Sequence, residues 1–379
     1  MEEERKNKII RVAQIIGRTL NGGVENLIYN YYLNIDRTKV QFDFFVEAPS
    51  KIVNVEAIEK LGGKVVIIPS YKKLGEYRKA LKKLFIEGKY DIVQSNMNSL
   101  SLFSLKAAKD AGIKIRICNS LSTTNKKETV HHLLKMMLKP YSKKYATHYF
   151  ACSDLCGTWL YGNDILNNEK YFKINNAIEI KKYQYNEEYR NELIQKHNLE
   201  GKFIVGTIGR LEPQKNQSFL LDIFHSILKS NNDSFLIIIG DGYLQEELEK
   251  KIESLGMKDK VLILTSKEVG VRGTASKYYS LFDAFVLPSL YEGLPTVGIE
   301  AQINTLPCFF ADTITKETEI NDRCHFISLD KNADDWAKYI LDNSIVERNS
   351  NFYCPSYDVK EQVKLLLDLY EKFIKEVSL

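Results

Sequence analysis

The chain has 379 residues, a length that suggests two domains at roughly 150 residues each. Hydrophobic residues make up 44% and charged residues 27%, which is ordinary for a globular protein. The net charge of +4 is too small to indicate a nucleic-acid-binding protein. No apolar run approaches the length of about 18 residues that a membrane-spanning helix needs.

The N-terminal segment MEEERKNK lacks the apolar core of a signal peptide. The six cysteines form no CxxC pair, so their spacing does not indicate a zinc site, and free thiols suit a reducing compartment. We therefore expect a cytoplasmic protein, associated at most with the inner face of the plasma membrane.

Short apolar runs rich in Val, Ile and Phe alternate with helical patterns along the first half. They are Ile9–Ile16, Phe42–Val46, Lys64–Pro69, Asp91–Asn96, Ile113–Ser120 and Thr147–Ser153. Nearly continuous apolar strands are expected in a parallel sheet that is buried on both faces. Their alternation with helices predicts βαβ units.

A glycine pair, Gly22 and Gly23, follows the first predicted strand and precedes a helix predicted over 24–32. Glycines let backbone N–H groups approach a ligand closely, and a helix N-terminus favours an anion. The loop does not match GxGxxG and lacks an acidic residue placed for ribose, which disfavours a dinucleotide site. We predict phosphate binding here, with a simple tight turn as the alternative.

Two basic, amphipathic helices are predicted near residues 71–85 and 131–145. A helix of this kind can rest on an anionic membrane surface. A solvated helix face remains the alternative interpretation of both segments.

The polar, tyrosine-rich segment 181–197 predicts a linker and one helix, so the domain boundary should lie between Asn176 and Gly201. We assign the domains to residues 1–185 and 186–357, followed by an amphipathic helix at 358–379. Six further apolar runs follow the boundary: Phe203–Gly209, Phe235–Gly240, Val261–Thr265, Ala284–Ser289, Pro307–Ala311 and His325–Leu329. The pattern predicts an α/β protein with two doubly wound, Rossmann-like domains that face a central cleft.

Arg210 and Lys215 stand five residues apart in one loop, directly after the first strand of the second domain. Two cations at the carboxyl end of a strand can neutralise a diphosphate, Arg by its planar fork and Lys as a point charge. Gly209 leaves room for the ligand to approach. A solvated basic loop is the alternative.

The segment 287–300 contains a strand, a loop and the start of a helix, with Pro295 in the first helical turn. Glu292 in the loop and Glu300 in the helix are suited to grip sugar diols, and both lie in apolar sequence. The N–H groups that begin the helix would be free to bind phosphate oxygens. They belong to Leu294, Thr296 and Val297.

The segment Pro-Ser-x-x-Glu-Gly-x-Pro, with its second Glu eight positions after the first, resembles the retaining glycosyltransferases of family 4, which have the GT-B fold. The Gly-Arg-Leu-x-x-x-Lys loop, Gly240-Asp-Gly242, the early glycine pair and Ala151-Cys-Ser153 resemble the same family in order, from about residue 10 to residue 340. Segments 299–302, 306–308 and 312–316 resemble bacterial capsular and exopolysaccharide transferases most.

The resemblance implies a hexosyltransferase that uses a nucleotide-sugar, a UDP-sugar, and a glycan or lipid-linked acceptor, retains anomeric configuration and needs no metal or other cofactor. Arg210 and Lys215 would hold the donor diphosphate, Glu292 the sugar hydroxyls and Glu300 the ribose. The remaining implied donor contacts are Gly22, Gly23, Gly209, Thr265, Gly293, Leu294, Pro295, Thr296 and Val297. The resemblance also implies that the helix at 358–379 packs back on the first domain.

The sequence departs from the family at residues 116–123, Arg-Ile-Cys-Asn-Ser-Leu-Ser-Thr. Asn119 and Leu121 stand where relatives carry histidines, and Gln94 and Asn96 occupy another such place. We keep Asn119 as a catalytic candidate because its amide can donate a hydrogen bond. Three alternatives stay open: a weakly active or inactive nucleotide-sugar-binding partner subunit, a sugar epimerase or phosphorylase of the same fold, and a dinucleotide-dependent dehydrogenase.

Overall fold

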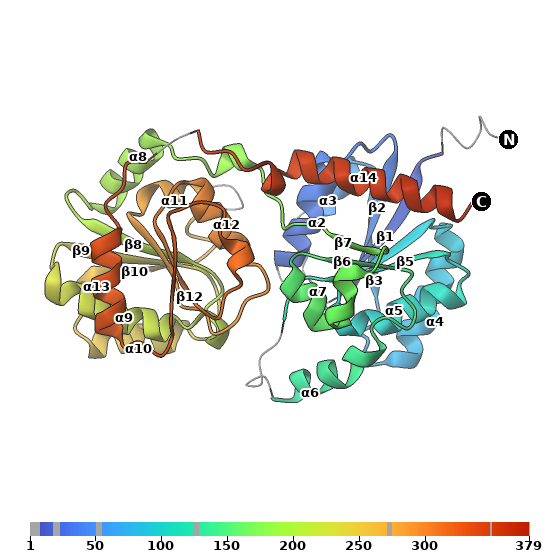
Figure 1. Ribbon diagram of the computed structural model, residues 1–379, viewed down its shortest axis with the longest axis horizontal. Helices are drawn as coiled ribbons and strands as arrows, with labels where there is room; N and C mark the ends of the chain where they lie inside the picture. Colours follow the sequence, from blue (N-terminus) through green and yellow to red (C-terminus); the bar gives the residue numbers. More distant parts are fainter. Residues whose placement is uncertain are drawn as a thin grey trace. The chain divides into compact units, whose positions relative to one another are not determined.

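The computed structural model describes residues 8–17, 23–50, 55–123, 129–270, 275–348 and 351–378, apart from the side chains of 129–132 and 134. The chain forms two compact units (Figure 1). Unit 1 comprises Met1–Ile178 and Ser356–Leu379, and unit 2 comprises Glu179–Pro355. The C-terminal segment therefore belongs to the same unit as the N-terminal half.

Unit 1 contains a seven-stranded parallel sheet in the order β3-β2-β1-β4-β5-β6-β7. The strands are β1 (Ile10–Gly17), β2 (Val40–Glu47), β3 (Lys64–Ile68), β4 (Ile92–Ser95), β5 (Ile115–Ser120), β6 (His148–Ala151) and β7 (Tyr171–Lys173). The direction of winding reverses between β1 and β4. Ligands of open α/β sheets bind at such a switch point, outside the carboxyl ends of the strands.

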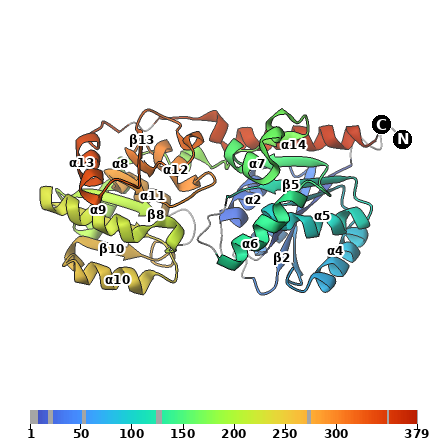
Figure 2. The same cartoon turned by 60° about the horizontal axis from the view of Figure 1, so that its bottom comes forward.

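Helices cover both faces of this sheet (Figures 1 and 2). On one face, α2 (Gly23–Asn34), α3 (Val55–Lys60) and α14 (Val359–Glu376) contribute to a single hydrophobic cluster. On the other face, α4 (Leu74–Gly88), α5 (Ser101–Asp110) and α7 (Asp154–Tyr161) form a second cluster. The remaining helical segments are α6 (Thr129–Leu138), η1 (Asn98–Leu100), η2 (Lys139–Tyr141) and η3 (Asn163–Asn167).

The last helix, α14, packs into the core of unit 1. Asp358 caps its N-terminus by accepting a hydrogen bond from the Lys360 N–H at 2.9 Å. Buried side chains then recur at helical spacing, at Val363, Leu366, Tyr370 and Phe373 among others. Their burial in the cluster that contains β1 and β2 makes α14 part of the unit rather than an appendage.

Unit 2 contains a six-stranded parallel sheet in the order β10-β9-β8-β11-β12-β13, with its switch point between β8 and β11. The strands are β8 (Phe203–Ile208), β9 (Ser234–Ile239), β10 (Val261–Leu264), β11 (Ala284–Leu287), β12 (Cys308–Ala311) and β13 (Cys324–Ile327). The prediction of two doubly wound α/β units is confirmed.

The helices of unit 2 also divide between the two faces of its sheet (Figure 1). One hydrophobic cluster includes α9 (Gln217–Ser230), α10 (Gln245–Ser254) and α13 (Ala333–Asn343). The other includes α8 (Glu187–His197), α11 (Ala275–Leu281) and α12 (Thr296–Ile303). Short 3₁₀ turns complete the unit: η4 (Ile180–Lys182), η5 (Pro213–Lys215), η6 (Lys258–Lys260) and η7 (Lys316–Thr318), with η8 (Pro355–Tyr357) at the return to unit 1.

None of the helices in the described part of the chain is both long and apolar enough to span a membrane.

Candidate functional site

The loops after β8 and β11 meet at the switch point of unit 2. Lys215 Nζ lies 2.6 Å from Glu292 Oε1, and the two side chains are only 12% and 8% exposed. Gln214 joins the same contact, because its Nε2 donates to Glu292 Oε2 at 3.2 Å and to the Tyr291 carbonyl at 3.0 Å. Two loops 77 residues apart in sequence therefore form one polar centre.

Arg210, the second cation of the β8 loop, lies on its solvent side. Its side chain is 61% exposed, and Nη1 donates to Glu212 Oε1 at 2.8 Å. Gly209 leaves room beside it, because a Cβ at residue 209 would lie 3.1 Å from Lys215 Cε and the lysine side chain would have to shift. Gly240 fits beneath the same loop, since its Cβ would lie 1.9 Å from the Gly209 carbonyl oxygen. The loop is thus shaped to let Lys215 lie against its backbone while Arg210 stays exposed.

Glu300 lies on α12 and is held by two tyrosines. The Tyr279 hydroxyl donates to Glu300 Oε2 at 2.5 Å, and Tyr183 also hydrogen-bonds the carboxylate. Burial raises the pKa of Glu300, while these hydroxyls and the positive charge of Lys215 oppose the rise. Lys215 is therefore electrostatically coupled to Glu300 as well as paired with Glu292.

The start of α12 differs slightly from expectation. Pro295 is the N-cap rather than a residue of the first turn, and the helix begins at Thr296. The Pro295 carbonyl accepts from the Gly298 N–H at 2.9 Å. Within the described residues, the Thr296 and Val297 N–H groups make no hydrogen bond. Two of the three expected N–H groups can thus donate to an anion, and Leu294 and Gly293 are buried just before them.

Thr265, the expected contact for the nucleotide base, directly follows β10, and its polar groups are engaged. Its N–H and hydroxyl donate to Glu268 Oε2 at 2.7 Å and 2.6 Å. The next residue, Ser266, donates through its N–H to Asp241 Oδ1 at 3.2 Å. In this arrangement the polar groups of Thr265 stabilise its own loop. A nucleotide base bound here would contact the loop surface and not a free Thr265 hydroxyl.

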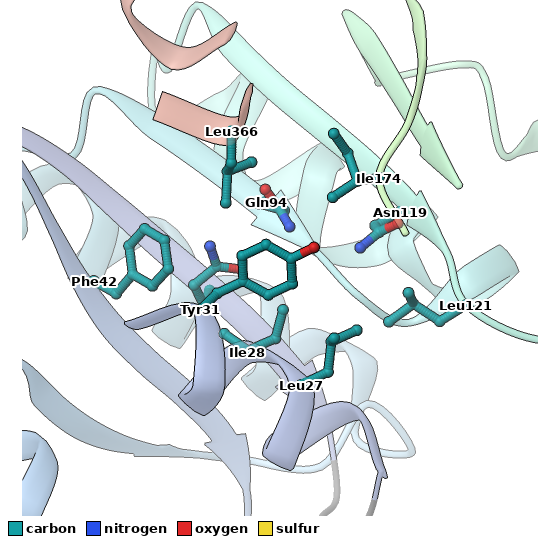
Figure 3. A pocket seen from close by; sticks show the side chains of 10 residues that line it. Leu27, Ile28, Tyr31, Phe42, Gln94, Asn119, Leu121, Ile174 and Leu366 are labelled. Carbon is teal, nitrogen blue, oxygen red and sulfur yellow. The ribbon is translucent and has the colours of Figure 1, made fainter. Parts of the chain in front are cut away.

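In unit 1, Asn119 is the second-last residue of β5, at the carboxyl edge of the sheet. Its Nδ2 donates to Asn96 Oδ1 at 2.8 Å, so one of the two amide hydrogens of this catalytic candidate is turned inward. Leu121 and Gln94 line the same small cavity (Figure 3). Gly23 is the first residue of α2, whereas Gly22 lies outside the described residues.

Sequence reasoning missed the residues that support the candidate carboxylates and Asn119. Tyr279 lies in the apolar helix α11, and Tyr183 lies in the segment predicted as a linker. Tyr370 lies on α14, 276 residues from its partner Gln94. A tyrosine in an amphipathic helix carries no local signal for such a contact. Among the described residues no group of three or more His, Cys, Asp or Glu is placed to hold a metal ion.

Comparison with known proteins points to one class. Residues 189–371 match the family model described as glycosyl transferases group 1. The chain is 27% identical to EpsF of Bacillus subtilis (strain 168), a protein named only provisionally as a glycosyltransferase, over 95% of this chain and 96% of EpsF. It is 26% identical to the Escherichia coli UDP-Gal:alpha-D-GlcNAc-diphosphoundecaprenol alpha-1,3-galactosyltransferase, over 77% of this chain and 78% of that one.

The fold also has solved counterparts. The structure of Anabaena Alr3699/HepE in complex with UDP-glucose aligns with a TM-score of 0.72 at 15% identity, covering 97% of this chain and 99% of that chain. The two units therefore have the GT-B fold. The family match over the second half of the chain and the names of the relatives support a group 1 glycosyltransferase. A further relative, CapH of Staphylococcus aureus, is 25% identical over 83% of this chain and 84% of that one, and is named for capsular polysaccharide biosynthesis.

Proposed function

We propose that the chain transfers a hexose from a UDP-sugar to a glycan or lipid-linked acceptor, with retention of anomeric configuration. The observation that carries the proposal is the Lys215–Glu292 pair at the switch point of unit 2. This pair combines a cation for a diphosphate with a carboxylate for sugar hydroxyls, beside a helix that begins with unbonded N–H groups.

Catalysis in this proposal rests on charge and position. When the bond between the sugar C1 and the diphosphate oxygen breaks, negative charge grows on the departing diphosphate. Lys215, Arg210 and the N–H groups of Thr296 and Val297 would stabilise that charge. The acceptor oxygen bonds to C1, and its proton leaves with the diphosphate or to solvent. The groups that bind the donor are thus the groups that assist its departure.

Glu292 and Glu300 would accept hydrogen bonds from hydroxyls at the two ends of the donor, the transferred sugar and the ribose. Glu292 is tied to Lys215, which places it next to the diphosphate, where the transferred sugar is attached. Glu300 is oriented by Tyr279 and would accept from the ribose diol. Because both carboxylates serve binding, we do not propose the flanking pair of a glycosidase.

Relatives support UDP as the nucleotide. The name of the E. coli relative specifies a UDP-sugar donor and a diphosphoundecaprenol acceptor, and the HepE structure holds UDP-glucose. For the present chain, a UDP-sugar and a lipid-linked glycan are therefore the substrates we propose, and we propose that Lys215 and Arg210 take the part that a metal ion would otherwise play.

A ligand panel followed by a transfer assay tests the proposal. UDP, GDP, ADP and NAD are each added to the purified chain and thermal unfolding is measured. A ligand at 100 times its dissociation constant stabilises by about 2.7 kcal/mol. Stabilisation by UDP alone, followed by transfer from a UDP-sugar to a membrane-lipid extract with an unchanged anomer by NMR, is the expected result.

The other outcomes separate the alternatives. UDP binding without transfer or donor hydrolysis would favour the binding-only partner subunit that the Asn119 and Leu121 positions suggest. Stabilisation by NAD would favour a dehydrogenase. No response to any nucleotide would contradict the proposed donor site.

We also propose that α6 and η2 contact the inner face of the plasma membrane. Leu133, Met137 and Tyr141 are more than half exposed there. Four lysines accompany them: Lys135, Lys139, Lys143 and Lys144. Exposed apolar side chains beside cations suit an anionic lipid surface.

The other basic helix, α4, offers less for a membrane. Its apolar residues Tyr77, Leu81 and Phe85 are fully buried in the core, which explains its amphipathic pattern without lipid. Sedimentation with phosphatidylglycerol vesicles tests the difference. Binding should be lost when both Leu133 and Met137 are changed to Glu and kept in the control Ile86→Glu on α4. Equal binding to phosphatidylcholine, or loss only in the control, would contradict the assignment.

A further inference from the structure

Four buried polar side chains of unit 1 form a closed ring of hydrogen bonds, called here the amide ring. The Tyr370 hydroxyl donates to Gln94 Oε1 at 2.6 Å, and Gln94 Nε2 donates to Asn96 Oδ1 at 3.2 Å. Asn96 Nδ2 donates to Gln14 Oε1 at 3.0 Å, and Gln14 Nε2 closes the ring on the Tyr370 oxygen at 3.3 Å. The ring joins β1, β4 and α14 just where the sheet changes direction.

One backbone contact fixes the direction of these bonds. Asn96 Nδ2 also faces the Ile15 carbonyl oxygen at 3.3 Å, and a carbonyl oxygen can only accept. Asn96 Oδ1 must therefore point the other way and accept. Since that oxygen lies 2.8 Å from the Asn119 amide, Asn119 has to present its Nδ2 to it. The orientation of the Asn119 side chain therefore follows from that of Asn96. Asn96 is in turn held by Gln14 and Gln94, and the Tyr370 hydroxyl links these two glutamines.

This orientation leaves the Asn119 carbonyl oxygen turned away from the ring. Asn119 is 5% exposed, and its Oδ1 has no hydrogen-bond partner within the described residues. The side chain lines a cavity of about 10 Å³ with Gln14, Gln94, Tyr31, Leu121 and Ile174 (Figure 3). A cavity of this size holds one water-sized group.

The polar groups that line this cavity differ in which of their hydrogen-bond donors and acceptors are already used. Gln14, Gln94 and Asn119 each use one of their two amide hydrogens in a bond to the ring, and the Tyr31 hydroxyl donates to the Asn175 carbonyl at 2.6 Å. Asn119 Oδ1 has no partner among the described residues, so only a group that donates can satisfy it. A hydroxyl group can donate to this oxygen and also accept from a remaining amide hydrogen, whereas an anionic oxygen can only accept.

We propose that Tyr370 is a positioning residue that acts through the amide ring to hold Asn119 as a hydrogen-bond acceptor for a hydroxyl of the sugar substrate. The proposal rests on the proposed function and adds to it. Asn119 would serve as an acceptor and not as the donor that its sequence position suggested, and the C-terminal helix would contribute to the site without touching substrate.

A double-mutant cycle tests the coupling. Tyr370→Phe removes the hydroxyl that closes the ring, and Asn119→Ala removes the group that the ring orients. Each should lower kcat/KM by about tenfold, which is what one buried hydrogen bond contributes. The double variant should be no slower than Asn119→Ala alone, because Tyr370 acts only through Asn119. Additive losses would overturn the proposal, since a merely structural tyrosine adds its own loss.

Tyr32→Phe is the matched control. Tyr32 is a fully buried tyrosine of the same hydrophobic cluster, and its hydroxyl donates to the Leu61 carbonyl at 3.0 Å, away from the ring. It loses one buried hydroxyl like Tyr370→Phe, so it reports the cost of the substitution itself. Equal loss of activity in the two variants would overturn the proposal.

A second measurement does not depend on turnover. In protein labelled with ¹⁵N at asparagine, the Asn119 side-chain amide signal is identified by its loss in Asn119→Ala. It should move in Tyr370→Phe and stay in place in Tyr32→Phe. An unmoved signal in Tyr370→Phe overturns the ring mechanism even if the enzyme is active. Absence of transfer by the unmodified chain would instead overturn the proposed function, and the assignment of a sugar hydroxyl with it.

Discussion

The switch points of the two sheets carry opposite kinds of polar centre. At β8 and β11 of unit 2 the centre is charged, with Lys215 paired to Glu292. At β1 and β4 of unit 1 it is neutral, built from amides and a tyrosine hydroxyl. The same place in the same kind of sheet thus holds side chains of different chemistry, because the fold supplies the location and the side chains supply the chemistry.

The two centres also differ in whether a ligand can replace one of the hydrogen-bonding partners within them. The Lys215–Glu292 pair retains some exposure, so an incoming diphosphate can replace the carboxylate beside the cation. The amide ring is almost fully buried, and opening it would leave polar groups unpaired. We therefore expect the charged centre to bind and release, and the neutral centre to hold its shape.

The largest effect should come from removing the cation of the charged centre. Lys215→Ala should lower kcat/KM for a UDP-sugar by about 100- to 1000-fold, because the departing diphosphate loses a stabilising charge in a partly buried site. Steady-state kinetics measures this. Lys202→Ala is the control, since its ammonium pairs with the exposed Asp233 at 2.7 Å on the surface of the same unit. A loss within about threefold of the control would mean that unit 2 carries no diphosphate site.

Glu292→Gln should separate binding from transfer. The substitution leaves Lys215 without its carboxylate, so UDP no longer has to displace that partner. Thermal unfolding should then show a greater stabilisation by UDP in the variant than in the unmodified chain, while transfer falls because the sugar loses a hydrogen-bond acceptor. A smaller UDP-induced shift in the variant would contradict the exchange of partners at the charged centre.

Tyr279→Phe should weaken donor binding by about tenfold, the lower end of what one hydrogen bond to a charged group contributes. Its pH dependence is more informative. The ribose needs the ionised Glu300, whose pKa burial raises and the Tyr279 hydrogen bond lowers. Without that bond the pKa rises further. As pH falls, the variant should therefore lose donor affinity at a higher pH than the unmodified chain does.

The neighbouring tyrosine provides the control for this pH profile. Tyr278 is equally buried, and its hydroxyl lies 3.1 Å from His197 Nε2 rather than near Glu300. Tyr278→Phe should leave the acid limb of kcat/KM in place. If Tyr278→Phe and Tyr279→Phe shifted the acid limb equally, the shift would come from a disturbance of helix α11 and not from the Tyr279–Glu300 hydrogen bond.

The smallest effect should come from chelation. We expect the transfer rate to be unchanged after dialysis against EDTA, because Lys215, Arg210 and the start of α12 already provide positive charge for the diphosphate. Rates are measured before dialysis, after it, and after Mg²⁺ is added back. A loss that Mg²⁺ restores would show that the charged centre is incomplete by itself.

The sequence allowed most of the architecture to be predicted, for an identifiable reason. Buried parallel strands are continuous apolar runs, and twelve such runs correspond to β1–β6 and β8–β13. The strand β7 was missed because it has only three residues, none of them fully buried. Lys215 and Glu292 were expected at one edge because both follow strands of a parallel sheet, and that edge is where they meet.

The supporting contacts could not be predicted in this way. Gln14 and Gln94 are polar residues within otherwise apolar strands. This makes them unusual in the sequence but does not indicate which residue they hydrogen-bond. Their contact with Tyr370 depends on how α14 lies on the sheet. The same holds for Tyr279 and Glu300, which come from different helices. Hydrogen bonds between distant elements depend on three-dimensional packing, which no local pattern encodes.

The path of the chain has a consequence for synthesis on the ribosome. Ile178 ends the first part of unit 1, and its N–H and C=O bond to Tyr357 and Val359, where the chain returns after completing unit 2. A nascent chain that stops before α14 holds every residue of unit 2 but leaves the apolar face formed with Tyr370 and Phe373 uncovered in unit 1. The domain begun first is finished last, so premature termination should yield aggregation-prone protein rather than a working half.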